Sequence, residues 1–229
     1  DDGPLAVSPS PVVLTDLSLI TGDGGLANGN DKALSATDDG VNVAAEFLLA
    51  VGENYGADGA GGQTVGGFHF VSDDLTEGAT AGYLVTGLFT TAGEGESQQL
   101  YAYLHDGQIL LSTSSTWDGG QSETTALTLN VTLNGDVSQQ QYMAIEHGAG
   151  EDGSGATADT IDGVYSDQVV SVGDFGLDVK LQATVTTTDA DGDFINQTVT
   201  SGDVSSQFVI GDDGPLAVSP SPVVLTDLS

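Results

Sequence analysis

Apolar and polar residues alternate along much of the chain, which is typical of β-strands with one buried face. From Leu177 to Val185, for example, every second residue is apolar. Glycine and aspartate turns separate the alternating segments. The predicted strands are Leu5–Val7, Val12–Leu17, Gly67–Val71, Tyr83–Thr90, Gln98–Leu104, Gln108–Thr113, Thr124–Leu133, Gln140–Glu146, Val169–Val172, Gly176–Thr187, Asn196–Thr200 and Ser206–Ile210.

Two dipeptides, Asp106-Gly107 and Asn134-Gly135, each lie between two predicted strands. Such dipeptides favour tight hairpin turns, because both positions of the turn need a positive φ. The segment Val43–Val51 predicts one short helix. Many short strands bounded by turns indicate an all-β fold, and we expect an elongated antiparallel β-sandwich.

The two ends of the sequence are identical. Residues 1–18 read DDGPLAVSPSPVVLTDLS, and residues 212–229 repeat them without a mismatch, at an offset of 211 residues. We interpret residues 1–211 as one full tandem repeat and residues 212–229 as the start of the next one. A period of this size is that of a domain, so each repeat should fold by itself. Pro4, Pro9 and Pro11 near the boundary predict a stiff linker or an edge strand.

The composition excludes several functions. Lys and Arg total 2 against 34 Asp and Glu, for a net charge of −32. A chain this acidic is not expected to bind nucleic acid or anionic membranes. No apolar run reaches the ~20 residues of a membrane span. The absence of cysteine excludes disulfides and thiolate metal sites, and together with the scarcity of Lys and Arg it is typical of a secreted bacterial surface protein.

Carboxylates at alternate positions mark a candidate metal site. Asp189, Asp191 and Asp193 surround Gly192 in the sequence TDADGD. Calcium takes six to eight oxygen ligands, so this loop is a candidate calcium site between strands. It departs from an EF-hand loop, because glycine stands at the fourth position and Thr200 at the twelfth. The alternative is a solvated aspartate turn.

A second acidic cluster lies at the repeat boundary. Asp212 and Asp213 correspond to Asp1 and Asp2, and Asp16 recurs as Asp227. A calcium ion bound by these residues would join two neighbouring repeats. The alternative is an acidic cap on a linker.

Catalytic signals are weak. The three histidines, His69, His105 and His147, have no paired metal-binding spacing, and no nucleophile motif is present. We therefore predict no enzymatic activity, no catalytic residue and no organic cofactor. Trp117 is consistent with either a sugar-stacking platform or a core position.

Three segments occur in a characteristic order: QYMAIEH at residues 141–147, TVTTTDADGD at 184–193 and FVIGDDGP at 208–215. With YGADGAG at 55–61, they resemble the large tandem repeats of giant bacterial repeats-in-toxin adhesins, which are exported by type I secretion. The resemblance covers residues 45–215. It implies a calcium-rigidified, immunoglobulin-like β-sandwich of the extender type.

The expected function is that of a calcium-stabilised extender module, a spacer that projects the ligand-binding tip of an adhesin from the bacterial surface for adhesion and biofilm formation. Its expected location is extracellular. Its expected partners are the neighbouring identical repeats and calcium ions, with each module otherwise monomeric. The alternative is a carbohydrate- or surface-ligand-binding module on the same adhesin.

Overall fold

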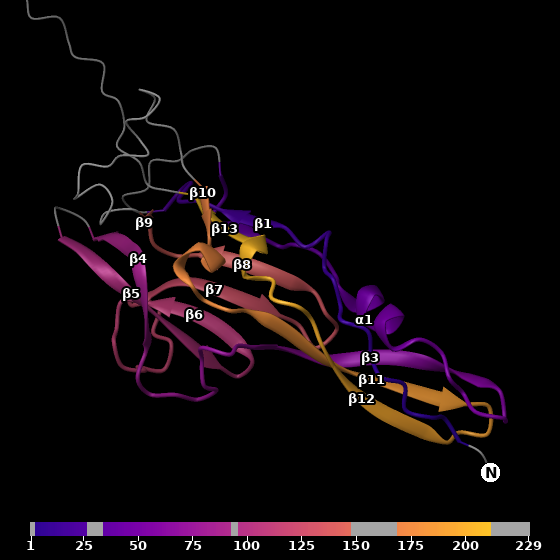
Figure 1. The fold of residues 1–229 in the computed structure, drawn as a ribbon. Coiled ribbons are helices and arrows are strands. Elements are labelled where there is room, and N and C mark those ends of the chain that lie inside the picture. The colour runs from indigo at the N-terminus through magenta and orange to yellow at the C-terminus, as the bar shows by residue number, and fades with distance from the viewer. Residues whose placement is uncertain (1–2, 27–33, 93–95, 148–168, 212–229) are drawn as a thin grey trace, which may run out of the picture.

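A computed structural model describes residues 3–26, 34–92, 96–147 and 169–211. These residues form an elongated all-β body, which confirms the predicted fold class (Figure 1). They contain one α-helix, α1 (Ala44–Val51), and two 3-10 turns, η1 (Val172–Phe175) and η2 (Ser205–Gln207). The strands are β1 (Leu19–Thr21), β2 (Thr37–Asp38), β3 (Ala60–Val71), β4 (Tyr83–Ala92), β5 (Glu96–His105), β6 (Gln108–Ser112), β7 (Thr125–Val131), β8 (Val137–Gln141), β9 (Ile145–His147), β10 (Val169–Ser171), β11 (Lys180–Asp189), β12 (Phe194–Thr200) and β13 (Phe208–Gly211).

The strands form three sheets around one core. A seven-stranded antiparallel sheet has the order β2-β8-β7-β6-β5-β4-β9, and a three-stranded antiparallel sheet has the order β12-β11-β3. The third sheet, β1-β13-β10, contains a parallel pair, β1 with β13. Large side chains from different sheets meet in the core: Phe70 of β3 contacts Phe208 of β13 edge-on, with 5.7 Å between the ring centroids. Phe68, also on β3, contacts Phe47 of α1 at 4.9 Å.

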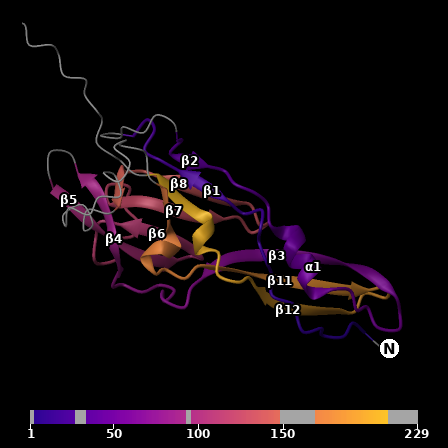
Figure 2. The same ribbon diagram turned by 45° about the horizontal axis from the view of Figure 1, so that its top comes forward.

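The long strands β3, β11 and β12 extend to one end of the molecule, where the N-terminus also lies (Figures 1 and 2). We call this end the tip. The seven-stranded sheet and the β1-β13-β10 sheet lie in the other half. The chain therefore enters at the tip, and its last described residue, Gly211, lies in the opposite half.

Both predicted hairpins are confirmed. Asp106 and Gly107, with φ of 51° and 69°, connect β5 to β6. Gly135, with φ of 91°, lies in the turn between β7 and β8. The predicted helix at Val43–Val51 is also confirmed, because α1 begins one residue later and ends at the same residue.

The N-terminal segment corrects the sequence-based prediction. Residues 3–18 contain neither of the two predicted strands, and only Val12 forms an isolated parallel bridge, with Ser201. The segment is nevertheless extended and packed, since Val12, Leu14 and Leu17 are buried in the core. Its three prolines lack the N–H groups that a β-ladder needs, so it runs beside β12 without forming one. These residues are therefore part of the folded body.

Two further boundaries differ from prediction. The strand predicted to begin at Gly67 begins at Ala60, within a glycine-rich segment. The strand predicted to begin at Gly176 begins at Lys180, because η1 and a left-handed Gly176 precede it. Residues 60–66 are mostly glycine and polar residues without apolar alternation, so the sequence pattern did not identify them as a strand, although they pair with β11. The later start of β11 reflects a turn that still places Leu177 and Val179 in the core.

Candidate metal site

The turn between β11 and β12 forms the tip, and its conformation is fixed by Asp189. The backbone N–H groups of Gly192 and Asp193 donate hydrogen bonds to Oδ1 of Asp189, at 3.0 and 2.8 Å. Gly192 has a φ of 103°, which L-residues with a side chain rarely adopt. The sequence DADGD therefore makes a tight turn that uses one oxygen of Asp189 and leaves the other available.

The start of β3 brings a third acidic residue, Asp58, to this turn. The N–H of Ala190 donates to the carbonyl oxygen of Gly59, at 3.0 Å. At Gly61 the two strands approach so closely that a Cβ atom would lie 2.0 Å from the carbonyl oxygen of Asp189. Only glycine permits this approach, so the glycine-rich segment positions Asp58 beside the turn.

Three carboxylates converge at the tip. Asp58, Asp189 and Asp191 each place an oxygen within 4.8 Å of the others. Asp189 is only 2% exposed, and its Oδ2 is buried without a hydrogen-bond partner. An unsatisfied buried carboxylate oxygen is costly, because it has lost its hydration shell. A cation at this position would supply the missing interaction.

The two central carboxyl groups differ in their pKa. Burial acts to raise the pKa of Asp189, but hydrogen bonds from Asp191 and from the backbone N–H groups of the turn outweigh it, so this pKa is lowered. The pKa of Asp191 is raised, first by its hydrogen bond with Asp189 and then by burial and by the negative charge of Asp189. A divalent cation between the two carboxyl groups would relieve the repulsion that raises the pKa of Asp191.

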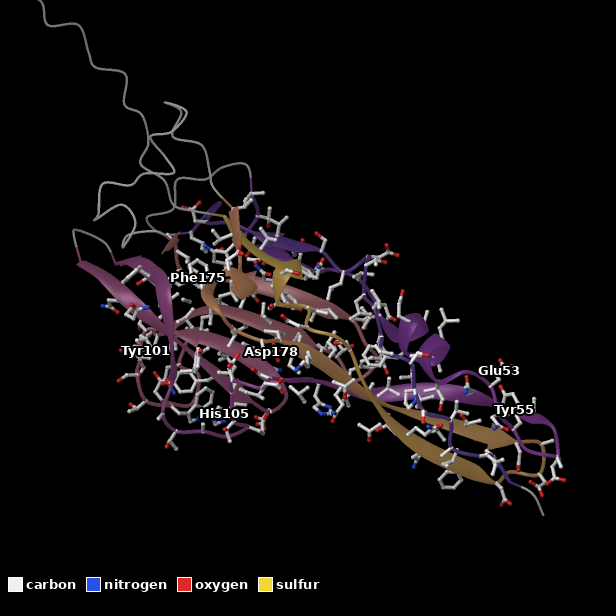
Figure 3. All side chains as sticks on the ribbon, viewed as in Figure 1. Glu53, Tyr55, Tyr101, His105, Phe175 and Asp178 are labelled. Carbon is white, nitrogen blue, oxygen red and sulfur yellow. The ribbon has the colours of Figure 1, made fainter. Side chains whose placement is uncertain are left out.

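No basic side chain of the described chain lies near this cluster. Lys180 is the single Lys or Arg among the described residues, and its ammonium group contacts Asp73 and Asp178. It begins β11, nine residues before Asp189, so about 30 Å of strand separates the two. Glu53 and Tyr55 lie on the same side as the tip (Figure 3). The pKa of Tyr55 is raised by burial and by the negative charge of Glu53. The Glu53 carboxylate also adds to the negative potential on this side of the molecule.

The other predicted ligands have different positions. The carboxylate of Asp193 faces Gly3, where a Cβ would lie 3.5 Å from Asp193 Oδ2 and 3.8 Å from Asp189 Oδ2. Asp16 is exposed on the N-terminal segment and is not part of the three-carboxylate group. The predicted ligands Asp1, Asp2, Asp212 and Asp213 lie outside the described residues.

Asp58 was not among the residues that the sequence singled out as ligands. Its signal was weak, because it is one aspartate in a glycine-rich segment and 130 residues separate it from Asp189. The alternate spacing of aspartates in the sequence identified Asp189 and Asp191, two of the three carboxylates. The pairing of β3 with β11 brings in the third, Asp58.

The aromatic residues give little support to a sugar platform. Trp117 stacks on His105, with ring centroids 3.6 Å apart and planes 7° from parallel. Tyr103 packs against the same indole at 5.3 Å. Since His105 covers one face of Trp117 and Tyr103 is itself buried, these rings are used for packing.

The ligand atoms of the three-residue cluster are all carboxylate oxygens, which suit a hard cation such as calcium or magnesium better than zinc or copper.

Among the described residues, no helix has the length and apolar character needed to cross a membrane. No protein-family description, curated protein or solved structure matches this chain.

Proposed function

We propose that the chain is a calcium-stabilised extender module of a secreted bacterial surface adhesin. The observation that carries this proposal is the position of the two chain ends. Gly3 lies at the tip and Gly211 in the opposite half, while residues 212–229 repeat residues 1–18. Successive copies joined in this way extend end to end, so each copy adds length and projects a binding domain farther from the cell.

Calcium binding at Asp58, Asp189 and Asp191 would stabilise this module. The cation satisfies the buried Oδ2 of Asp189 and joins β3 to the β11–β12 turn. A ligand that binds only the folded state adds about 2.7 kcal/mol to stability at a roughly hundredfold excess over Kd. Calcium is scarce in the cytosol and plentiful outside, so the module would reach full stability only after export.

The high negative charge fits the same role. Like-charged neighbouring modules repel one another, which disfavours collapse and misfolding between identical sequences. The charge also opposes folding of each module, and calcium binding offsets part of that cost.

The proposal is tested by X-ray scattering from proteins with one, two and three copies of residues 1–211, in millimolar calcium. We expect the maximum dimension to rise by the same increment with each added copy. Circular dichroism of each protein serves as the control for folding. A maximum dimension that grows only as the cube root of the mass would mean that the copies collapse together, and would exclude a spacer.

A further inference from the structure

Residues 3–18 cover a surface of the module that is built to hold an extended peptide. Three apolar side chains anchor the segment, because Val12, Leu14 and Leu17 are at most 5% exposed and belong to the core. Most side chains before Val12 are exposed or half-buried. We call the surface that residues 3–18 cover the segment-binding surface.

Hydrogen bonds hold this segment from two sides. The N–H of Ser10 donates to the carbonyl oxygen of Ala50 in α1, at 2.9 Å. The N–H of Gly202, which follows β12, donates to the carbonyl oxygen of Val12 at 3.1 Å. The side-chain amide of Gln197 donates to the carbonyl oxygen of Val7. All three bonds use the backbone of the segment, so its selectivity comes from the three apolar anchors.

The chain carries a second copy of this segment. Residues 212–229 are identical to residues 1–18, and Val223, Leu225 and Leu228 correspond to the three anchors. The same side chains in the same order can make the same contacts with the segment-binding surface. The surface therefore has two equivalent ligands in each chain.

The second copy cannot reach the segment-binding surface of its own module in this register. Gly3 lies beside Asp193 at the tip, and the bridge at Ser201 lies eight residues farther along, which is about 26 Å of strand. Gly211 lies beyond that bridge, in the opposite half (Figures 1 and 2). Residue 214, the counterpart of Gly3, is three Cα–Cα steps from Gly211 and at most about 11 Å away. The second copy can therefore reach this surface only on another module.

We infer that residues 214–229 of one molecule bind the segment-binding surface of a second copy of this chain, in place of that copy's own residues 3–18. The contact joins unlike ends of the two molecules, so it propagates into open head-to-tail chains. The tethered N-terminal segment competes at an effective concentration of about 1 mM, so the exchange becomes prominent when that segment is disabled. The inference needs only the two copies of the segment and does not depend on the proposed function.

The test uses the full 229-residue chain with Val12→Asp and Leu14→Asp, which disable the N-terminal copy and leave the C-terminal copy intact. Each molecule should then accept residues 214–229 of another. Its weight-average mass in sedimentation should rise with concentration to at least about twice that of the parent chain. Val223→Asp with Leu225→Asp is the matched control, since it has the same composition and charge, and it should stay monomeric.

A variant with all four substitutions lacks both copies of the segment and should not associate. If it associates as strongly as the variant changed at Val12 and Leu14, the association is nonspecific and the inference is overturned. A folded Val12 and Leu14 variant that stays monomeric overturns it as well. If that variant is unfolded by circular dichroism, an excess of a synthetic peptide of residues 1–18 should restore the spectrum of the parent. Failure of the peptide to restore the spectrum would also overturn the inference.

Discussion

The two carboxylate oxygens of Asp189 have different surroundings, and this difference defines its role. Oδ1 accepts two backbone hydrogen bonds that fix the turn, and Oδ2 is buried without a partner. An asparagine at this position retains an acceptor for the turn and removes the charge. The structural and cation-binding roles of the residue can thus be separated by one substitution.

We predict that Asp189→Asn removes about one bound calcium ion per chain, measured by titration calorimetry, and reduces the calcium-induced rise in Tm. Asp106→Asn is the control, because Asp106 is an exposed hairpin residue with φ of 51°, which asparagine tolerates. The control should bind as many calcium ions as the parent. An unchanged stoichiometry in Asp189→Asn would show that the tip cluster is only a solvated turn.

A second carboxylate, Asp203, contributes to stability mainly through hydrogen bonds. It accepts from the backbone N–H groups of Val179 and Ser205, at 3.1 and 2.9 Å, and from the Ser205 hydroxyl at 3.0 Å. Burial acts to raise the pKa of Asp203, but these hydrogen bonds and the charge of Lys180 outweigh it, so the pKa lies below the ordinary value of 3.8. Its contribution is therefore fully present above pH 3.8 and is lost as the pH falls through the lower, folded-state pKa.

We predict that Asp203→Asn lowers the free energy of unfolding by about 1 kcal/mol at pH 7, since the group is exposed and its charge is screened. The difference from the parent should shrink as the pH falls below 3.8, and urea unfolding at pH 7 and pH 3 in chelator measures it. A stability loss of equal size at both pH values would show that Asp203→Asn acts by changing the geometry of the hydrogen bonds and not by removing the charge.

At the scale of elements, the tip depends on the close approach of β3 and β11. A Cβ on Gly61 would lie 2.0 Å from the Asp189 carbonyl oxygen, whereas on Gly66 of the same strand the nearest atom would be 3.5 Å away. We predict that Gly61→Ala separates the two strands at the tip, costs about 3 kcal/mol and weakens calcium binding.

Gly66→Ala is the matched control and should cost about 1 kcal/mol or less. Urea unfolding and calcium titration of both variants measure these effects. Equal losses in the two variants would mean that the tip tolerates a wider spacing of the strands.

Elements with a strong local pattern were predictable from the sequence. The turns at Asp106-Gly107 and Asn134-Gly135 and the helix at Ala44–Val51 follow from turn chemistry and apolar spacing. The N-terminal segment was not predictable, because its apolar residues alternate as in a strand while its prolines prevent a ladder. One of the three carboxylates of the candidate metal site could not be predicted either, since Asp58 meets Asp189 only through the long-range pairing of β3 with β11.

At the scale of the whole molecule, the negative charge makes stability dependent on cations. We predict that millimolar calcium raises the Tm of the 229-residue chain by at least several degrees over excess chelator, followed by circular dichroism. Magnesium should have a smaller effect at equal ionic strength, because it requires strict octahedral geometry and retains its waters. Equal effects of calcium, magnesium and added sodium chloride would indicate general screening without a specific site.

The parallel pairing of β1 with β13 determines how the module responds to mechanical load. Leu19, Ile20 and Thr21 pair in register with Phe208, Val209 and Ile210. Tension along the proposed array pulls on the N-terminal end of β1 and on the C-terminal end of β13. The two strands are parallel, so these forces act in opposite directions along the strand axis. In a parallel pair this load shears all the interstrand hydrogen bonds together, instead of breaking them one after another. Since forced unfolding is governed by the unfolding barrier, the strands that bear the load are arranged to resist it, and the segments on either side of them would extend first.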